Sequence, residues 1–83
     1  MQLTIESLMD IWGRTIGDTP VRQQFEIWAV DNTLPIIKEA IVVTARKNLT
    51  EGLSPEFRIR FCSGVVQVRT ARAERYSREK RAQ

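Results

Sequence analysis

Four stretches of the chain carry apolar residues at the spacing of an α-helix, with polar residues between them. The first follows Thr4 and the second follows Thr19, and each repeats apolar residues three and four positions apart. The third runs from Thr33 to Asn48, and the fourth starts at Ser54. Short polar or glycine-containing breaks separate them, as is typical of turns. The pattern therefore predicts helices that lie antiparallel or steeply crossed to their neighbours in sequence.

The third stretch, TLPIIKEAIVVTARKN, predicts the central helix of the fold. Its apolar side chains cover more than one face, so we expect other helices to pack on several sides of it. Thr33 is the expected N-cap, and Pro35 falls in the first turn, where its missing N–H costs little. Arg46 and Lys47 would lie in the last turn, and Asn48 would take the left-handed conformation that ends the helix. The expected core positions are Ile37, Ala40, Ile41, Thr44 and Ala45.

Capping residues predict where the first two helices begin and end. Thr4 is the expected N-cap of the first helix, which we expect to end at Gly17. Thr19 is the expected N-cap of the second helix, and Pro20 its first residue.

The stretch after Ser54 fits two structures. Phe57–Phe61 alternates like a strand, Val65–Arg69 is rich in β-branched residues, and Ser63-Gly64 suits a hairpin turn. The same residues also form a helical row, and an isolated two-stranded hairpin is only marginally stable. Ser54-Pro55 is a helix start signal, and the closing sequence TARAERYSREKRAQ is helical in pattern. We therefore predict a fourth helix here.

The predicted fold is all-α: a compact bundle of about four helices over residues 1–70, with a basic helical tail at residues 71–83. A chain of 83 residues makes one small domain that buries only about 60–65% of its unfolded surface. Trp12 and Trp28 lie on apolar stripes, so we expect core packing rather than an aromatic binding platform. Cys62 lies in a mostly apolar segment, and we expect a buried, inert thiol.

Composition argues against catalysis and against a metal or other cofactor. The chain has no histidine and one cysteine, so neither the commonest general base nor a zinc site of nitrogen and sulfur ligands is present. No glycine-rich phosphate loop or nucleophile elbow occurs. We therefore predict a protein that is not an enzyme and binds no cofactor. The single cysteine and the acidic N-terminal sequence, which is unlike a signal peptide, favour a cytoplasmic location away from membranes.

Charge is unevenly distributed along the chain. Residues 1–53 hold five Lys/Arg and seven Asp/Glu, whereas residues 54–83 hold eight and three, which together give the net charge of +3. Basic tails of this kind commonly meet nucleic acid or an acidic protein surface.

Within this basic segment, arginine recurs at every third position. On a helix each three-residue step rotates by about 60° and climbs about 4.5 Å, so the guanidiniums form a gently spiralling row that suits successive phosphates. Tyr76 adds a ring on which an unpaired base can stack, and Glu74 is expected to pair with Arg78. The alternative is a solvated helix end without a ligand. We call the arginine row the arginine ridge; the candidate nucleic-acid-binding residues are Arg69, Arg72, Arg75, Tyr76, Arg78, Lys80 and Arg81.

A combination of motifs in the body of the chain is similar to a known family. The matching positions are Ile11-Trp12-Gly13-Arg14, Phe25 and Trp28, Ile36–Ile41 with Ala45, and Ser54–Phe57. Over roughly residues 5–70 this pattern resembles the DnaD-like domain of bacterial and phage replication-initiation and primosomal proteins. The resemblance implies a helical DNA-binding adaptor that helps to load a replicative helicase. It also implies that the region after the last core helix contributes to DNA binding.

The leading hypothesis is a non-enzymatic nucleic-acid-binding accessory protein of phage, plasmid or mobile-element replication, with single-stranded DNA favoured. The rival is a small helical subunit of a ribonucleoprotein effector, or a phage-encoded inhibitor, that docks on an acidic protein surface. A third alternative is a homo-oligomer whose fourth helix exchanges between chains.

Overall fold

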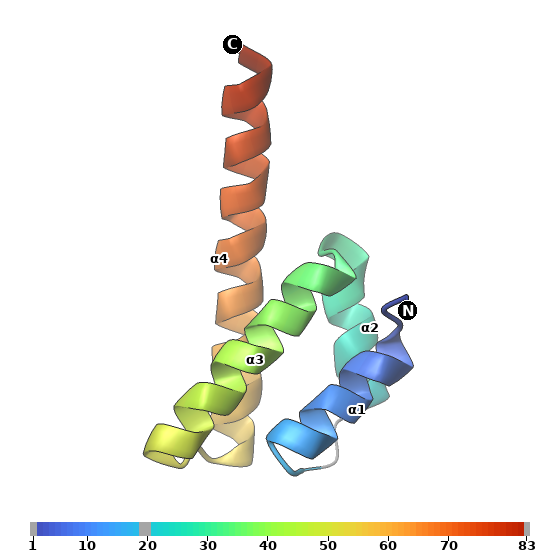
Figure 1. Ribbon diagram of the computed structural model, residues 1–83, viewed down its shortest axis with the longest axis vertical. Coiled ribbons are helices and arrows are strands. Elements are labelled where there is room, and N and C mark those ends of the chain that lie inside the picture. Colours follow the sequence, from blue (N-terminus) through green and yellow to red (C-terminus); the bar gives the residue numbers. More distant parts are fainter. Residues whose placement is uncertain (1, 19–20, 83) are drawn as a thin grey trace.

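The computed structural model describes residues 2–18 and 21–82, and it describes the side chains of these residues up to Glu79. The described chain forms four α-helices and no strand. They are α1 (Ile5–Thr15), α2 (Arg22–Asp31), α3 (Leu34–Glu51) and α4 (Pro55–Ala82). α3 contacts each of the other three helices, and α1 also packs on α2. The C-terminal part of α4 rises beyond the other helices (Figure 1). The all-α prediction is therefore confirmed.

α1 begins and ends as its sequence predicts. The Thr4 hydroxyl accepts a hydrogen bond from the backbone N–H of Ser7, and the Ser7 hydroxyl accepts one from the N–H of Thr4. This reciprocal capping box supplies partners for N–H groups that have none within the helix. At the other end, Ile16 is the C-cap and Gly17 has a φ of 96°, so the helix stops at the predicted glycine.

α2 begins later than predicted. Val21 has an extended backbone and is the N-cap, so the first helical residue is Arg22 rather than Pro20; residues 19 and 20 lie outside the described residues. No side chain caps this helix, but the Arg22 guanidinium lies 2.7 Å from Glu6 of α1 and 3.0 Å from Glu26. The hydrogen bond from Arg22 holds the pKa of Glu6 below its ordinary value. The exposed pair with Glu6 joins the start of α2 to α1, whereas the pair with Glu26 lies within α2.

α3 runs four residues further than its sequence pattern predicts. Asn48 stays helical, and the left-handed position is taken by Gly52, whose φ is 64°. Glycine has no Cβ to clash in that conformation, so it displaces asparagine from the role. Arg46 and Lys47 consequently lie a turn away from the helix end. Thr33 does occupy the N-cap position, but its side chain makes no capping hydrogen bond.

The core forms around α3, as its apolar pattern predicts. All five expected core positions of α3 are buried, and Ile37, Ala40 and Ile41 are completely inaccessible to solvent. Trp12 and Trp28 pack with Phe25 in an aromatic cluster, with ring centroids 5.2–6.3 Å apart. Such tilted and edge-on contacts are the favoured geometries of aromatic pairs. Both tryptophans therefore belong to the core.

α4 is one continuous helix, and the hairpin alternative is wrong. The Ser54 hydroxyl accepts a hydrogen bond of 3.3 Å from the N–H of Phe57, which caps the helix where the sequence predicts. Cys62 and Val66, one turn apart, are buried against the rest of the core. A helix can bury this row while its backbone groups bond internally, whereas a hairpin would leave both strand edges without partners.

Arg58 joins three parts of the fold that the sequence pattern did not connect. Its Nη1 donates to Asp18 Oδ2 at 3.0 Å and its Nε donates to Asn48 Oδ1 at 3.1 Å. Asp18 also accepts a hydrogen bond from the indole N–H of Trp12, and Asn48 accepts one of 3.0 Å from the N–H of Leu53. Arg58 therefore links the start of α4 to the end of α1 and the end of α3. Asn48 contributes as a side-chain acceptor and not as a helix terminator.

Candidate nucleic-acid interface

The C-terminal part of α4 has two environments along its length. Arg69 and Thr70 are half-buried, whereas every side chain from Ala71 to Glu79 is exposed. Figure 1 shows this part of α4 extending past the ends of the other three helices. We call residues 71–82 the α4 extension. The body of the protein therefore holds the helix up to Thr70. The side chains from Ala71 to Glu79 are accessible to a ligand, and Asp31 and Ile36 of the body border the extension on one side.

Arg69 differs from the rest of the arginine ridge because it belongs to the body. Its Nη1 lies 3.1 Å from Oε2 of Glu39 on α3, and the two side chains are 39% and 61% exposed. Pairs this exposed contribute at most about 1 kcal/mol, so a phosphate can replace Glu39 as the partner. Arg69 is thus paired with the Glu39 carboxylate in the free protein.

Arg72, Arg75 and Arg78 are exposed side chains of the α4 extension. Within residues 2–18 and 21–79, none of the three forms an ion pair. They lie on the unbroken helix α4, so successive guanidiniums are offset by about 4.5 Å along the axis. Three cations held on a rigid helix favour the binding of an anionic polymer over that of a single anion.

Of the remaining candidates, the structure describes the side chain of Tyr76 only. Tyr76 is 64% exposed and lies among the three arginines in sequence. Lys80 and Arg81 are part of α4, but their side chains lie outside the described residues.

The acidic residues of the α4 extension do not neutralise the ridge. Glu74 and Glu79 are exposed, and neither takes part in an ion pair among the described side chains. The expected pair between Glu74 and Arg78 is therefore absent. On an exposed helix the Coulomb energy of such a pair is similar to the entropy lost in holding two long side chains together.

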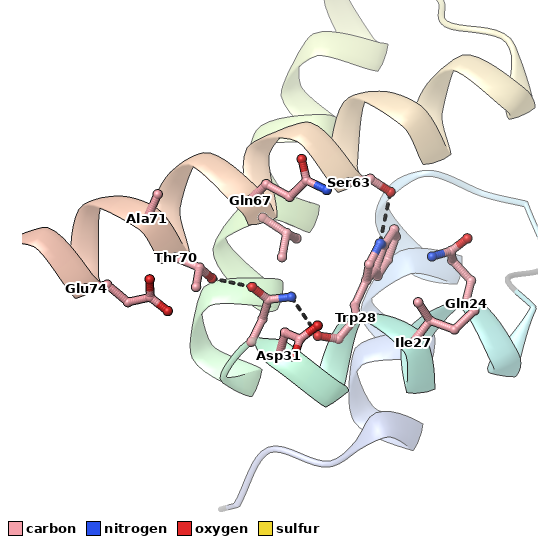
Figure 2. Close-up of a pocket in the computed structure, with 11 residues that line it drawn as sticks. Gln24, Ile27, Trp28, Asp31, Ser63, Gln67, Thr70, Ala71 and Glu74 are labelled. Carbon is pink, nitrogen blue, oxygen red and sulfur yellow. Dashed lines mark hydrogen bonds between the residues drawn. The ribbon is translucent and has the colours of Figure 1, made fainter.

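A groove of about 530 Å³ between α2 and α4 is the other notable surface feature. Trp28 donates its indole N–H to the Ser63 hydroxyl at 2.9 Å, and Thr70 donates to the side chain of Asn32, which in turn donates to the carbonyl of Trp28 (Figure 2). The bonds from Trp28 to Ser63 and from Thr70 to Asn32 fasten α2 and its C-cap to α4. The carboxylates of Asp31 and Glu74 lie along it, so it repels phosphate rather than extending the ridge.

Cys62 is buried beneath these surfaces, as predicted. Its side chain is inaccessible to solvent and lies beside Thr44 of α3. Burial raises the pKa of the thiol from 9.0 to about 12, although the hydrogen bond with Thr44 partly opposes the shift. The thiolate is the reactive form of cysteine, so this residue is not a nucleophile in the folded protein.

The inert thiol leads to a prediction. Native Cys62 should resist a disulfide-exchange reagent near pH 8, and its modification should become fast only when the protein is unfolded by denaturant. The pKa of the Cys62 thiol is higher in the folded than in the unfolded protein, so its contribution to the free energy of unfolding is complete below about pH 9. This contribution falls as the pH rises from 9 toward 12. Rapid modification of the native protein, at the rate seen in denaturant, would show that the thiol is accessible.

No three His, Cys, Asp or Glu side chains among the described residues gather as metal ligands. None of the described helices combines the length and apolar character needed to cross a membrane.

Comparison with known proteins identifies no relative. The chain matches no family model, no curated protein and no solved structure.

Proposed function

We propose that this protein is a non-enzymatic nucleic-acid-binding accessory protein that grips phosphates through the arginine ridge. The observation that carries the proposal is the α4 extension, where Arg72, Arg75 and Arg78 are exposed without ion pairs among the described residues. A solvated helix end has no need of arginine in particular. The planar guanidinium, in contrast, binds phosphate oxygens through two parallel hydrogen bonds.

The chemistry of the ridge favours backbone contacts over base reading. Arginines spaced along one helix follow a line of phosphates, and these contacts position the protein without reporting sequence. The groove beside the ridge is acidic, so it offers no second surface for the same strand. Tyr76 adds an exposed ring that can stack on an unpaired base, which favours single-stranded over double-stranded substrates.

The biological setting that we propose is replication of phage, plasmid or mobile-element DNA, in the cytoplasm. It rests on the resemblance to the DnaD-like domain described above. A helical body followed by a basic helix is the arrangement expected of an adaptor that holds DNA while its body contacts a partner protein.

A salt titration tests the proposal directly. Binding of the protein to fluorescent single- and double-stranded oligonucleotides of one sequence should be followed by polarisation between about 50 and 200 mM salt. With three to four phosphate contacts, the slope of log K against log salt should be about −2 to −3 on the single strand. Tighter binding to the single strand would support the role of Tyr76. Absence of binding to either oligonucleotide at the lowest salt would contradict the proposal.

A further inference from the structure

One face of α4 carries an apolar row that the body of the protein covers only in part, since Phe61 is half-buried with Lys47 Nζ of α3 5.2 Å from its ring centre. Phe57, Phe61, Gly64, Val68 and Ala71 follow one another at intervals of four, three, four and three residues, which places them along one side of the helix. Phe57 is 44% exposed and Val68 is 52% exposed, although both are large and apolar. The core-facing row of α4, Cys62 and Val66, lies on a different side. We call the row from Phe57 to Ala71 the α4 seam.

Gly64 lies at the middle of the α4 seam, and nothing within the chain explains it. It is exposed and helical, and a Cβ added there would meet no atom within 4 Å. Glycine weakens a helix interior relative to alanine, so a glycine inside α4 is expected where another segment packs closely against the helix. A hollow of about 430 Å³ lies at this position, bordered by apolar side chains of α4 and by Val43 of α3. Three arginines, Arg60, Arg69 and Arg72, also line it. The glycine and the hollow together fit a second helix lying close to α4.

We propose that the α4 seam binds the α4 seam of a second copy of this chain, with the two helices antiparallel. A register that places Gly64 opposite Val68 of the second copy also places Phe61 opposite Ala71, because three residues back along one helix match three residues forward along the other. Each large side chain then meets a small one. The two-fold symmetry repeats both contacts, so the hollow on each copy is filled by the other.

Charge complementarity supports this register. Arg60 and Glu74 are exposed, and neither forms an ion pair among the described side chains. They lie on the same flank of the α4 seam, where the proposed register sets Arg60 of one copy beside Glu74 of the other, twice per dimer. On the opposite flank, Arg58 would approach Arg72 of the second copy. Its guanidinium is instead held within the body by Asp18 and Asn48.

The pairing goes beyond the proposed function and does not depend on it. At each end of the α4 seam, Arg75 of the second copy reaches the exposed ring of Phe57, where a guanidinium can stack on the aromatic face. Arg72 and Arg78 remain at the margins. A dimer would thus carry two copies of the ridge, one at each end of the paired helices.

Sedimentation equilibrium of charge-reversed variants tests the pairing. Wild type should dimerise, whereas Arg60→Glu and Glu74→Arg should each raise the dimer dissociation constant by about tenfold or more, because each places like charges together twice. An equimolar mixture of the two variants should dimerise as well as wild type, since every contact in the mixed dimer again joins opposite charges. Circular dichroism should confirm that both variants fold, as expected for changes at exposed positions.

Gly64→Ala is an independent test, because it should stabilise the monomer and weaken the dimer. It should raise the thermal midpoint of dilute, monomeric protein by strengthening the helix, yet weaken dimerisation by filling the space for Val68 of the second copy. The proposal is overturned if wild type stays monomeric up to about millimolar concentration. It is equally overturned if the mixture of charge-reversed variants associates no better than each variant alone, or if Gly64→Ala tightens the dimer. Loss of dimerisation with nucleic-acid binding retained would separate this proposal from the previous one.

Discussion

Replacing Ile41 with alanine should lower the free energy of unfolding by about 2–5 kcal/mol, the range for truncating a buried aliphatic side chain. Ile41 is fully buried on α3, the helix that contacts all three others, so the cavity would open at the centre of the bundle. Domains of this size have total stabilities at the low end of about 5–15 kcal/mol. The variant should therefore be largely unfolded or melt tens of degrees earlier, as measured by circular dichroism in a thermal or urea titration.

Leu49→Ala is the matched control for this change. Leu49 lies on the same helix and is 83% exposed, so its truncation should alter the free energy of unfolding by no more than about 0.5 kcal/mol. A loss of similar size from both variants would indicate a general effect of alanine in α3. A loss below about 0.5 kcal/mol from Ile41→Ala would contradict the buried position of this residue.

Replacing Arg72, Arg75 and Arg78 together with glutamine should weaken nucleic-acid binding without unfolding the protein. Glutamine and arginine have similar helix propensities, and all three side chains are exposed, so α4 should persist. Each lost phosphate contact removes counterion release, and the slope of log K against log salt should shrink by about two to three. Polarisation titrations of both oligonucleotides across the salt series measure this slope.

A second triple variant distinguishes the effect of losing the ridge arginines from the effect of losing three positive charges. Changing Arg14, Lys38 and Arg46 to glutamine also removes three exposed cations, but from the body of the protein. Both variants lower the formal net charge from +3 to zero, and only the ridge variant should lose the steep salt dependence. Equal losses would indicate unspecific attraction. Because Arg75 also borders the α4 seam, the oligomeric state of each variant should be measured at the titration concentrations.

The sequence predicted the helices well because local signals agreed with the packing. Thr4, Ser54 and Gly17 mark helix ends where the backbone requires a cap or a left-handed residue, and each does so in the structure. The end of α3 was misplaced because two residues, Asn48 and Gly52, can both end a helix. Only the path of the chain decides between them. Asn48 is needed elsewhere, as the acceptor for Leu53 and Arg58.

The candidate site was less accessible to sequence reasoning. A three-residue spacing predicts that arginines share one side of a helix, but it gives no information on which of them contact the body. Arg69 pairs with Glu39, thirty positions earlier in the chain, and only tertiary structure brings them together. The α4 seam was hidden for a related reason: Phe57, Phe61 and Val68 fit a core-facing row as well as an exposed one. Their exposure depends on which side of α4 faces α3.

The continuity of α4 makes the ridge depend on the core. Helices shorter than about 12–15 residues are marginal in water because the first turn is costly to nucleate, and the α4 extension has about that length. Here nucleation is already complete, since the preceding turns are held by Val66 and Thr70 against the body. The α4 extension therefore needs only propagation, with the packed part of α4 as its template. A substitution at Val66, about 18 Å from Arg78 along the helix, would accordingly disorder the ridge and resemble a binding defect.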